Sequence, residues 1–560
     1  MSSRNTRLGH EAHNLFHEVE IMNRVYPALL VIALSTSSAL LGAKRFYPDD
    51  PLTAEPAPLN TENVKRRQLS RYYDLFAHTL GKPGERSTNG HVIRSRAVNT
   101  LGEPMDGAWY TKRHYWKPMT TEELTRGPGG MTPPSMDGPW TIVSAKTEGV
   151  TPGFVMVDSK GRRFFLKFDP LGNPEMATAA DMISARFFHA LGYHVYDTYL
   201  VYFTMDQLVL GKDVQVTDKK GRRKITQGDV LETLLKVPKN KDGKYRGLAS
   251  LQLPGLPLGP FRFSGLRGDD PNDIVPHEHR RDLRGYYVFC AWLDHDDSRA
   301  INTLDTFVEE DGVKHVKHHL LDFGATLGSS TTRPNSPRAG GEYLFSWGPT
   351  IKEIATLGLW VPRWAFAKYP NYPSIGRIEA EVFDPERWYP EYPNPAFANR
   401  LPDDEFWAAK QVMAFSDDQI RAIVRTGQIS EPAAESYLAD CLIRRRDKIG
   451  KAFFAKVLPL DRFSIRDGEI VFEDLAKTHK LGQTGPLKIT WSQFDNETEK
   501  KTPLSGETSF AIPKEGLTRQ ATSYYAADIC RDGDTRRTIT VYMRTEGSRE
   551  PQLVGIDRSW

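Results

Sequence analysis

The chain has 560 residues, more than one compact core usually holds, so two or three folded units are expected. Its 39% hydrophobic and 26% charged residues are typical of a globular protein and exclude a disordered chain or one that crosses a membrane many times. The formal net charge is only +3 and no basic run is interleaved with aromatics, so nucleic-acid binding is excluded from the hypotheses.

The N-terminal segment combines a basic residue, an apolar run and small residues. Residues 25–43 read VYPALLVIALSTSSALLGA, with Arg24 before them and Lys44 after them. The apolar centre is shorter than the roughly 20 residues that a spanning helix needs. Residues 1–43 are therefore expected to be an export signal, cleaved after Ala43, that places the protein in the periplasm or envelope. An uncleaved anchor, giving membrane attachment through the N-terminus, is one alternative, and a buried helix is another.

Residues 44–139 are predicted to be a linker followed by an irregular, partly helical extension. Residues 44–60 are rich in Pro and polar residues, as linkers are. A helix over 61–80 is indicated by apolar residues at helical spacing, with Gly81 at its end. These apolar residues are Leu69, Tyr72, Tyr73, Phe76 and Leu80.

A change of pattern at Trp140 marks the start of a domain expected to reach residue 460. Its first part, about 140–211, is predicted to contain three strands joined by tight turns, a helix that stops at Gly192, and a further strand. This order is that of a small lobe built on a sheet.

The second part, about 212–460, is predicted to be mainly helical after a loop-rich connector that reaches Asp273. A helix is expected over 278–293, and Ser416 with Gln419 forms a capping box for a later one. Between these helices, Asp311-Gly312 predicts the turn of a β-hairpin.

Residues 461–560 are predicted to form a separate β-domain. The short alternating runs KITWSQF, TSFAIP and TITVYMRT are separated by Gly, Asp and Asn turns. The expected fold class is therefore α+β, with an all-β domain at the C-terminus.

The residues of greatest chemical interest lie at the open end of the predicted hairpin. Residues 295–302 read HDDSRAIN, and LDFG follows at 321–324. Asn302 precedes the first strand and Asp322 follows the second, so their side chains are expected to lie close together. Carboxylate and amide oxygens are ligands for hard divalent cations such as Mg²⁺.

These motifs resemble the catalytic loop and the metal-binding D-F-G of the protein-kinase-like superfamily. The resemblance implies a bilobal core that binds ATP and Mg²⁺ or Mn²⁺, with Asn302 and Asp322 as the metal ligands. It implies that Asp297 orients the acceptor hydroxyl and that Arg299 is a phosphate-facing cation.

The resemblance also extends to Lys167 in FFLKFDP, on the third predicted strand, which would bind the phosphates of ATP. Asp181 on the following helix would hold this lysine, with Glu175 as the second choice. The first hairpin offers Gly149 and Gly153 as the phosphate cover. A solvated strand lysine is the alternative for Lys167.

Several positions depart from the pattern of typical protein kinases. No G-x-G-x-x-G precedes Lys167, Arg299 stands where Lys is usual, and Asp296 replaces the Arg of H-R-D. No A-P-E motif follows. These departures make the chain more similar to the atypical branches: HipA-like, phosphoinositide-kinase-like and CotH-like kinases.

The implied function is an ATP- and metal-dependent phosphotransferase that acts on a protein, lipid or small-molecule hydroxyl in the envelope. Its partners would be a nucleotide and a phosphoacceptor that the sequence does not identify. The alternative is a pseudokinase-like binding protein without catalysis, favoured by the missing glycine loop and the scarcity of ATP outside the cytoplasm. The complete set of Lys, Asp, Asn and Asp favours the enzyme.

Overall fold

The computed structural model describes residues 44–560, apart from residues 89–90, 131, 146–152, 219–220, 483–484, 507, 514–520 and 548. The expected export signal, residues 1–43, therefore lies outside the described residues. Within these described ranges, no helix is both long enough and apolar enough to cross a membrane.

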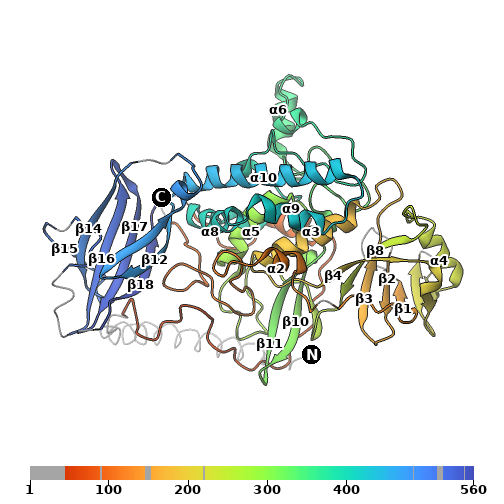
Figure 1. Cartoon of the computed structure of the whole chain (residues 1–560), viewed down its shortest axis with the longest axis horizontal. Helices are drawn as coiled ribbons and strands as arrows, with labels where there is room; N and C mark the ends of the chain where they lie inside the picture. Colours follow the sequence, from red (N-terminus) through yellow and green to blue (C-terminus); the bar gives the residue numbers. More distant parts are fainter. Residues whose placement is uncertain are drawn as a thin grey trace, which may run out of the picture.

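The described chain mixes helices and strands, as the sequence predicts. Figure 1 shows a small sheet at one end, helices in the middle and a second sheet at the other end, next to the C-terminus. The α-helices are α2 (Thr121–Arg126), α3 (Met176–Ala190), α4 (Gln227–Leu234), α5 (Arg281–Leu293), α6 (Trp347–Ala355), α7 (Pro395–Ala398), α8 (Pro402–Met413), α9 (Asp417–Arg425), α10 (Pro432–Phe454) and α11 (Leu475–Thr478). The strands are β1 (Trp140–Ala145), β2 (Gly153–Val157), β3 (Arg163–Lys167), β4 (Thr198–Phe203), β5 (Leu208–Leu210), β6 (Gln215–Asp218), β7 (Gly221–Lys224), β8 (Tyr245–Leu251), β9 (Leu256–Gly259), β10 (Thr303–Glu310), β11 (Val313–Leu320), β12 (Leu460–Arg466), β13 (Glu469–Asp474), β14 (Leu487–Phe494), β15 (Lys501–Pro503), β16 (Ser523–Arg531), β17 (Asp534–Thr545) and β18 (Gln552–Arg558).

The small sheet has six strands in the order β4-β8-β3-β2-β1-β5. On β3, Phe164 and Leu166 are buried in the apolar core of this sheet. Because successive side chains of a strand point to opposite faces, Lys167 is directed to the other face, toward α3. The strand pattern thus separates the lysine from the apolar core and presents it to a helix.

The small sheet continues beyond the expected small-lobe limit near residue 211. Strand β8 lies between β3 and β4, inside the segment predicted to be a loop-rich connector, and α4 also lies there. At Gly247 of β8, an added Cβ would lie 2.8 Å from Leu166 Cδ1, so a larger residue there would displace the end of the Leu166 side chain. A glycine within a short strand weakens the sequence pattern, which explains why this strand was not predicted.

The predicted hairpin is confirmed and sets the positions of two candidate ligands. Strands β10 and β11 are antiparallel, with Thr303 opposite Leu320, and β9 extends the sheet on the β10 side. Asp311 (φ 51°) and Gly312 (φ 79°) form the turn in the left-handed conformation that an Asp-Gly hairpin favours. This register brings the residue before β10 next to the residues after β11.

The core in the middle of the chain is built from helices. Every residue of α5 is buried, and α5 packs on α8 and α10. The capping box of Ser416 and Gln419 is confirmed at the start of α9. Helix α3 is also buried along almost its whole length, so its single acidic residue, Asp181, is held in an apolar setting.

The C-terminal segment is a five-stranded sheet in the order β15-β14-β16-β17-β18, accompanied by the β12-β13 pair and the short α11. Trp491, fully buried, lies in its apolar core. Phe46, in the expected linker, packs against Phe494 and Tyr542 of this sheet. The N-terminal stretch therefore lies on the C-terminal sheet.

The helix expected over 61–80 is wrong in its extent and in its orientation. Only Asp74–Gly81 is helical, as a π-helix labelled η2. Its buried residues are Asp74 and His78, whereas Phe76 and Leu80 are 60% and 70% exposed. Tyr72, Phe76 and Leu80 therefore face outward, whereas Leu69 and Tyr73 pack against the helical core together with the polar residues Asp74 and His78.

Candidate functional site

Lys167 joins two acidic side chains that are far apart in the sequence. Its Nζ atom lies 2.9 Å from Oδ2 of Asp181 on α3 and 2.8 Å from Oδ1 of Asp322, just after β11. The Asp181 side chain is 1% exposed, while those of Lys167 and Asp322 are 17% and 39% exposed. The cluster is thus closed on the α3 side and open to solvent on the Asp322 side.

The lysine of this cluster is held in its charged form. Burial alone would lower the pKa of Lys167, but the carboxylates of Asp181 and Asp322 raise it well above its usual value. The predicted partner Asp181 is the one that contacts the lysine. Glu175, the second choice, instead accepts a hydrogen bond from the Ser430 N–H at 2.8 Å.

Tyr196 connects the two acidic partners, and sequence reasoning missed it. Its hydroxyl donates to Oδ1 of Asp181 at 2.7 Å and accepts from the N–H of Asp322 at 3.1 Å. Phe323 stacks on Phe188 of α3, with ring centroids 4.8 Å apart. Together these contacts fix the backbone at Asp322, whose φ of 60° is left-handed, relative to α3.

Asn302 lies beside Asp322, as the hairpin predicts. The N–H of Leu321 donates to the Asn302 carbonyl at 2.9 Å, and the Asn302 Nδ2 donates to the Asp297 carbonyl at 2.7 Å. With Nδ2 used in this way, the Oδ1 of Asn302 remains as the acceptor of the side chain. The structure therefore brings Lys167, Asp181, Asn302 and Asp322 together.

Asp297 and Arg299 form an ion pair within the loop before Asn302. Glu391 lies on the other side of this guanidinium, at 3.6 Å from its Nε. Burial raises the pKa of Asp297 to about 6, and Arg299 opposes this shift. Arg299 is thus directed at carboxylates here, and its expected contact with phosphate remains a prediction.

The N-terminal extension contributes a residue that sequence reasoning missed. Oδ1 of Asp74 accepts a hydrogen bond from the N–H of Ala300 at 3.2 Å and also lies 3.2 Å from Nδ1 of His78. Both side chains are almost fully buried. Because Asp74 and Ala300 are separated by 226 positions, no local pattern could have indicated the contact.

The neighbouring aspartates have structural partners. Oδ1 of Asp294 accepts from Nε1 of Trp388 at 2.9 Å and lies 3.4 Å from Nη2 of Arg445. Oδ2 of Asp296 accepts from Nδ2 of Asn335 at 2.8 Å. The Asp294 and Asp296 side chains are thus bonded to Trp388, Arg445 and Asn335, whereas the Asp297 side chain pairs with Arg299 in the loop before Asn302.

Of the two candidate glycines for the phosphate cover, the structure describes Gly153 only. Gly149 lies outside the described residues. Gly153, at the start of β2, is opposite Lys167 in the β2-β3 pairing. One of the two predicted glycines is therefore adjacent to the lysine through the sheet register.

The oxygen atoms at this site suit a hard divalent cation. Among the described residues, no group of three or more His, Cys, Asp or Glu side chains is placed to hold a metal ion by itself. Mg²⁺ at nucleotide sites is usually bound by one or two carboxylates together with phosphate oxygens and water. The partly exposed Asp322 carboxylate and the Asn302 amide oxygen are a donor set of that kind, beside a charged lysine that can bind phosphate.

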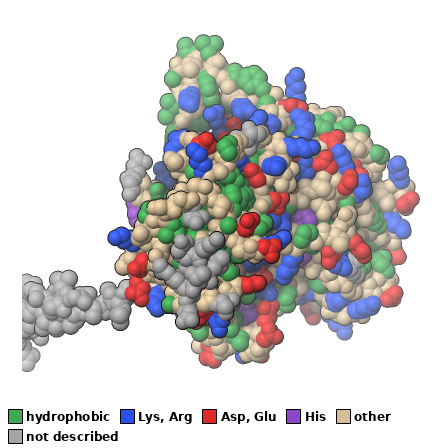
Figure 2. Space-filling model, turned by 60° about the vertical axis from the view of Figure 1, so that its left-hand side comes forward, with side chains coloured by type: hydrophobic (Ala, Val, Ile, Leu, Met, Phe, Trp, Pro, Cys, Tyr) green, Lys and Arg blue, Asp and Glu red, His purple; other side chains and the backbone are tan. Residues whose placement is uncertain are grey.

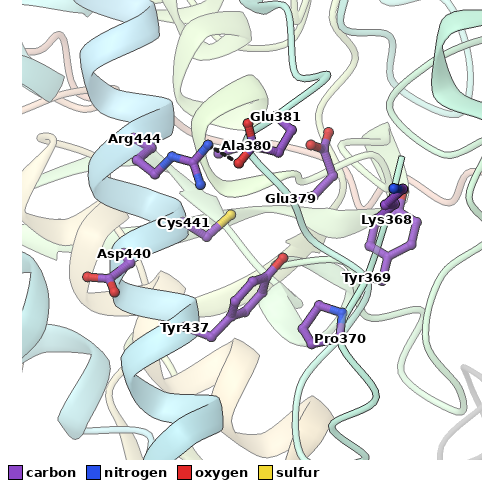
Figure 3. Close-up of a pocket in the computed structure, with 10 residues that line it drawn as sticks. All are labelled: Lys368, Tyr369, Pro370, Glu379, Ala380, Glu381, Tyr437, Asp440, Cys441 and Arg444. Atoms are coloured by element: carbon purple, nitrogen blue, oxygen red, sulfur yellow. Dashed lines mark hydrogen bonds and ion pairs between the residues drawn. The ribbon is translucent and has the colours of Figure 1, made fainter. Parts of the chain in front are cut away.

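Two hollows among the described residues lie elsewhere. One, of about 320 Å³, is lined by Tyr437 and Cys441 of α10 and by the facing residues 368–370 and 379–381 (Figure 3). Another, of about 460 Å³, lies at β1 and residues 211–215. Neither is lined by Lys167 or Asp322, so the candidate site is identified by its charged side chains and not by a deep cavity.

The solved structures to which the chain is similar include two kinases. No family model and no curated protein matches the chain. The Helicobacter pylori proinflammatory kinase CtkA is 10% identical, with a TM-score of 0.28 over 55% of this chain and 93% of that one. The Golgi casein kinase, solved with Mn and ADP bound, is 11% identical, with a TM-score of 0.26 over 57% of this chain and 75% of that one. TM-scores this low carry no argument, so the function is inferred from the chain's own side chains.

Proposed function

We propose that the chain is a kinase-like phosphotransferase that uses ATP and Mg²⁺ or Mn²⁺. The observation that carries the proposal is the position of the Lys167 ammonium, within hydrogen-bonding distance of both Asp181 and Asp322. A kinase requires both the lysine–acid pair on the helix and the metal-binding aspartate in place at once. Residues 140–460 would form the catalytic unit.

In this proposal each residue has one role. Lys167 binds phosphate oxygens, and Asp181 with Tyr196 orients it. Asn302 and Asp322 would hold the divalent cation, which would supply positive charge to offset that of the phosphates.

The acceptor side of the site is formed by the loop before Asn302. Asp297 would orient the acceptor hydroxyl and take up its proton at a carboxylate oxygen, and Arg299 would hold Asp297 in place. Its pKa of about 6 leaves this carboxylate mostly ionised, and therefore able to act as a base, at neutral pH. Gly153 and the backbone around it would cover the phosphates.

The proposal is tested by removing the lysine. Lys167→Ala should weaken ATP binding about tenfold or more, measured by titration calorimetry with Mg²⁺, because a charge-assisted contact to phosphate is lost. Lys160→Ala, on the β2-β3 turn and 59% exposed, is the matched control and should bind ATP as the parent does. Lys167→Ala leaves the charge of Asp181 buried without its cation, which should also lower stability. The double variant Lys167→Ala/Asp181→Asn removes that charge, so a loss of ATP binding in the double variant is due to the missing lysine and not to a loss of stability. Unchanged ATP affinity in both variants would refute the role.

We propose further that the protein acts in the cell envelope on a hydroxyl of protein, lipid or small-molecule origin. The support is the order of basic, apolar and small residues over 24–43. A reporter that is active only after export, fused to residues 1–60, should be active, and a strictly cytoplasmic signal would contradict the location.

A further inference from the structure

A projecting segment carries the most exposed apolar side chains of the described chain. This segment, residues 344–366, contains α6 and is here named the apolar tip. In Figure 1, α6 extends beyond α10 and away from the rest of the molecule. Figure 2 shows apolar side chains gathered over the end of this projection. The exposed fractions are 80% for Trp347, 60% for Ile351, 70% for Ile354, 92% for Leu357 and 86% for Leu359.

Exposure of this kind is unusual for a soluble surface. Large apolar side chains at the surface of a protein are normally scattered singly, and a contiguous group marks a site of interaction. Ile351 and Ile354 lie on the same helix, and Leu357 and Leu359 follow directly after it. The tip is therefore built to contact something apolar.

The base of the tip is tied to the loop that contains Asp297. The N–H of Leu344 donates to the Glu391 carbonyl at 2.8 Å, and the N–H of Glu391 donates to the Asp296 carbonyl at 2.8 Å. The tip's Trp364 donates from Nε1 to Oε1 of Glu342 at 2.7 Å. The projection is thus held firmly at its base, on the acceptor side of the candidate site.

The charges of the tip and its base favour an anionic surface. The tip contains Lys352, Arg363 and one acidic residue, Glu353, and Lys368 lies just beyond it. Arg363 pairs with Asp384 at 2.8 Å, so Lys352 and Lys368 are the cations that would meet anionic headgroups. Nζ of Lys352 lies 5.6 Å from the ring centroid of Trp360, so its charge is next to an aromatic side chain. Aromatic and aliphatic residues beside lysines are typical of segments that lie in the interface of an anionic bilayer.

We propose that the apolar tip inserts into the surface of a lipid bilayer that contains anionic lipids. A bilayer accommodates a convex apolar projection without a matching groove, and anionic headgroups complement the lysines. A second copy of the chain is the competing occupant, and the mass of the protein in solution distinguishes it from the bilayer. This binding does not depend on nucleotide, so it goes beyond the proposed phosphotransfer.

The test uses the full chain with a polarity-sensitive nitrobenzoxadiazole (NBD) label at the tip. In a Cys530→Ser background, where the other two cysteines are buried, Leu357→Cys carries the label. Ile274→Cys is the matched control, since Ile274 is 77% exposed in a different loop. Vesicles of phosphatidylcholine with phosphatidylglycerol should shift the emission at 357 to the blue and raise it roughly threefold, and leave the label at 274 unchanged. The control separates insertion of the tip from attachment through another part of the chain.

A second set of variants moves the label to another residue and changes the apolar side chains themselves. With the label at Ile354→Cys, the changes Leu357→Glu and Leu359→Glu should abolish the blue shift, and they should not affect folding because both side chains are exposed. Three results would overturn the proposal: no shift with either kind of vesicle, an equal shift with phosphatidylcholine alone, or a shift without vesicles accompanied by a doubled mass. No nucleotide is present, so failure here is distinct from failure of the proposed phosphotransfer.

Discussion

Two ion pairs each include a nearly fully buried aspartate on or next to a helix, and they differ in what surrounds them. Arg445 and Asp294 are 3% and 9% exposed, and the guanidinium also donates to the carbonyls of Ala291 and Trp292 at 2.6 and 3.0 Å. Lys167 is bonded to Asp181 in a similarly buried setting, but its second partner, Asp322, is 39% exposed. The first network is closed by the protein, whereas the second is open on one side.

This difference separates a structural pair from a binding pair. In the closed network all three guanidinium nitrogens of Arg445 donate to carbonyls of the protein itself. In the open one, a cation and a carboxylate are held in place at a surface that a ligand can reach. Substitutions in the open network should therefore change binding and turnover, and substitutions in the closed network should change stability.

The largest effect is expected at Asp322. Asp322→Asn should reduce metal-dependent ATP turnover on the order of a thousandfold and remove the metal dependence of nucleotide binding, because the charge that holds the cation is lost. Asp311→Asn is the matched control: it lies at the other end of the same hairpin, and both residues have a left-handed φ that Asn tolerates. Turnover that survives in Asp322→Asn would mean that the open network does not bind the metal.

Substitutions in the closed network of Arg445 and Asp294 should lower the stability of the protein. Arg445→Met should lower the free energy of unfolding by about 3 kcal/mol, since Asp294 is left buried without its cation. The denaturant midpoint measures this loss. Arg444→Met on the same helix is the control, because Arg444 is 51% exposed and its ion pair with Glu381 should contribute little. A strong loss of ATP affinity in folded Arg445→Met would contradict the claim that the closed network affects stability and not binding.

A smaller effect on rate is expected at Asp297. Asp297→Asn is nearly isosteric but cannot take up a proton, so turnover should fall roughly a hundredfold while ATP and metal affinity stay unchanged. Asp296→Asn, one residue earlier and bonded to Asn335, should keep most of its activity. If Asp296→Asn abolished turnover and Asp297→Asn did not, the assignment of the catalytic aspartate would be wrong.

The smallest effect is expected at Asp74, a positioning residue. Asp74→Ala should slow turnover about tenfold at unchanged ATP affinity, because the N–H of Ala300 loses its buried acceptor. Asp74→Asn retains an oxygen at this position and should restore the rate. Equal loss in both variants would show that the hydrogen bond to Ala300 is not what matters.

The sequence predicted the parts of the site that depend on local patterns. The kinase-like resemblance placed Lys167 on the third strand, where strand alternation directs it away from the apolar core. Asn302 and Asp322 are brought together by a hairpin whose Asp-Gly turn sets the register. Asp181 lies on a helix that an apolar pattern and Gly192 delimit. Each of these depends on neighbours within one element or one hairpin.

The parts that were missed depend on distant packing. Asp74 reaches Ala300 only because its helix turns a polar face inward and leaves Phe76 exposed, the reverse of what its apolar pattern predicts. Strand β8 joins the small sheet between β3 and β4, with Gly247 close to the Leu166 side chain. In both cases the tertiary contact, and not the local propensity, decides the structure.

The most direct test of the central claim is the thermal unfolding of the full chain with ATP, in the presence and absence of Mg²⁺ or Mn²⁺. A ligand that binds only the folded state raises the unfolding temperature by mass action. The open network at Lys167 and Asp322 predicts a rise that requires both ATP and a divalent metal and is lost in Asp322→Asn. No rise with either metal would contradict the claim that this network binds a nucleotide.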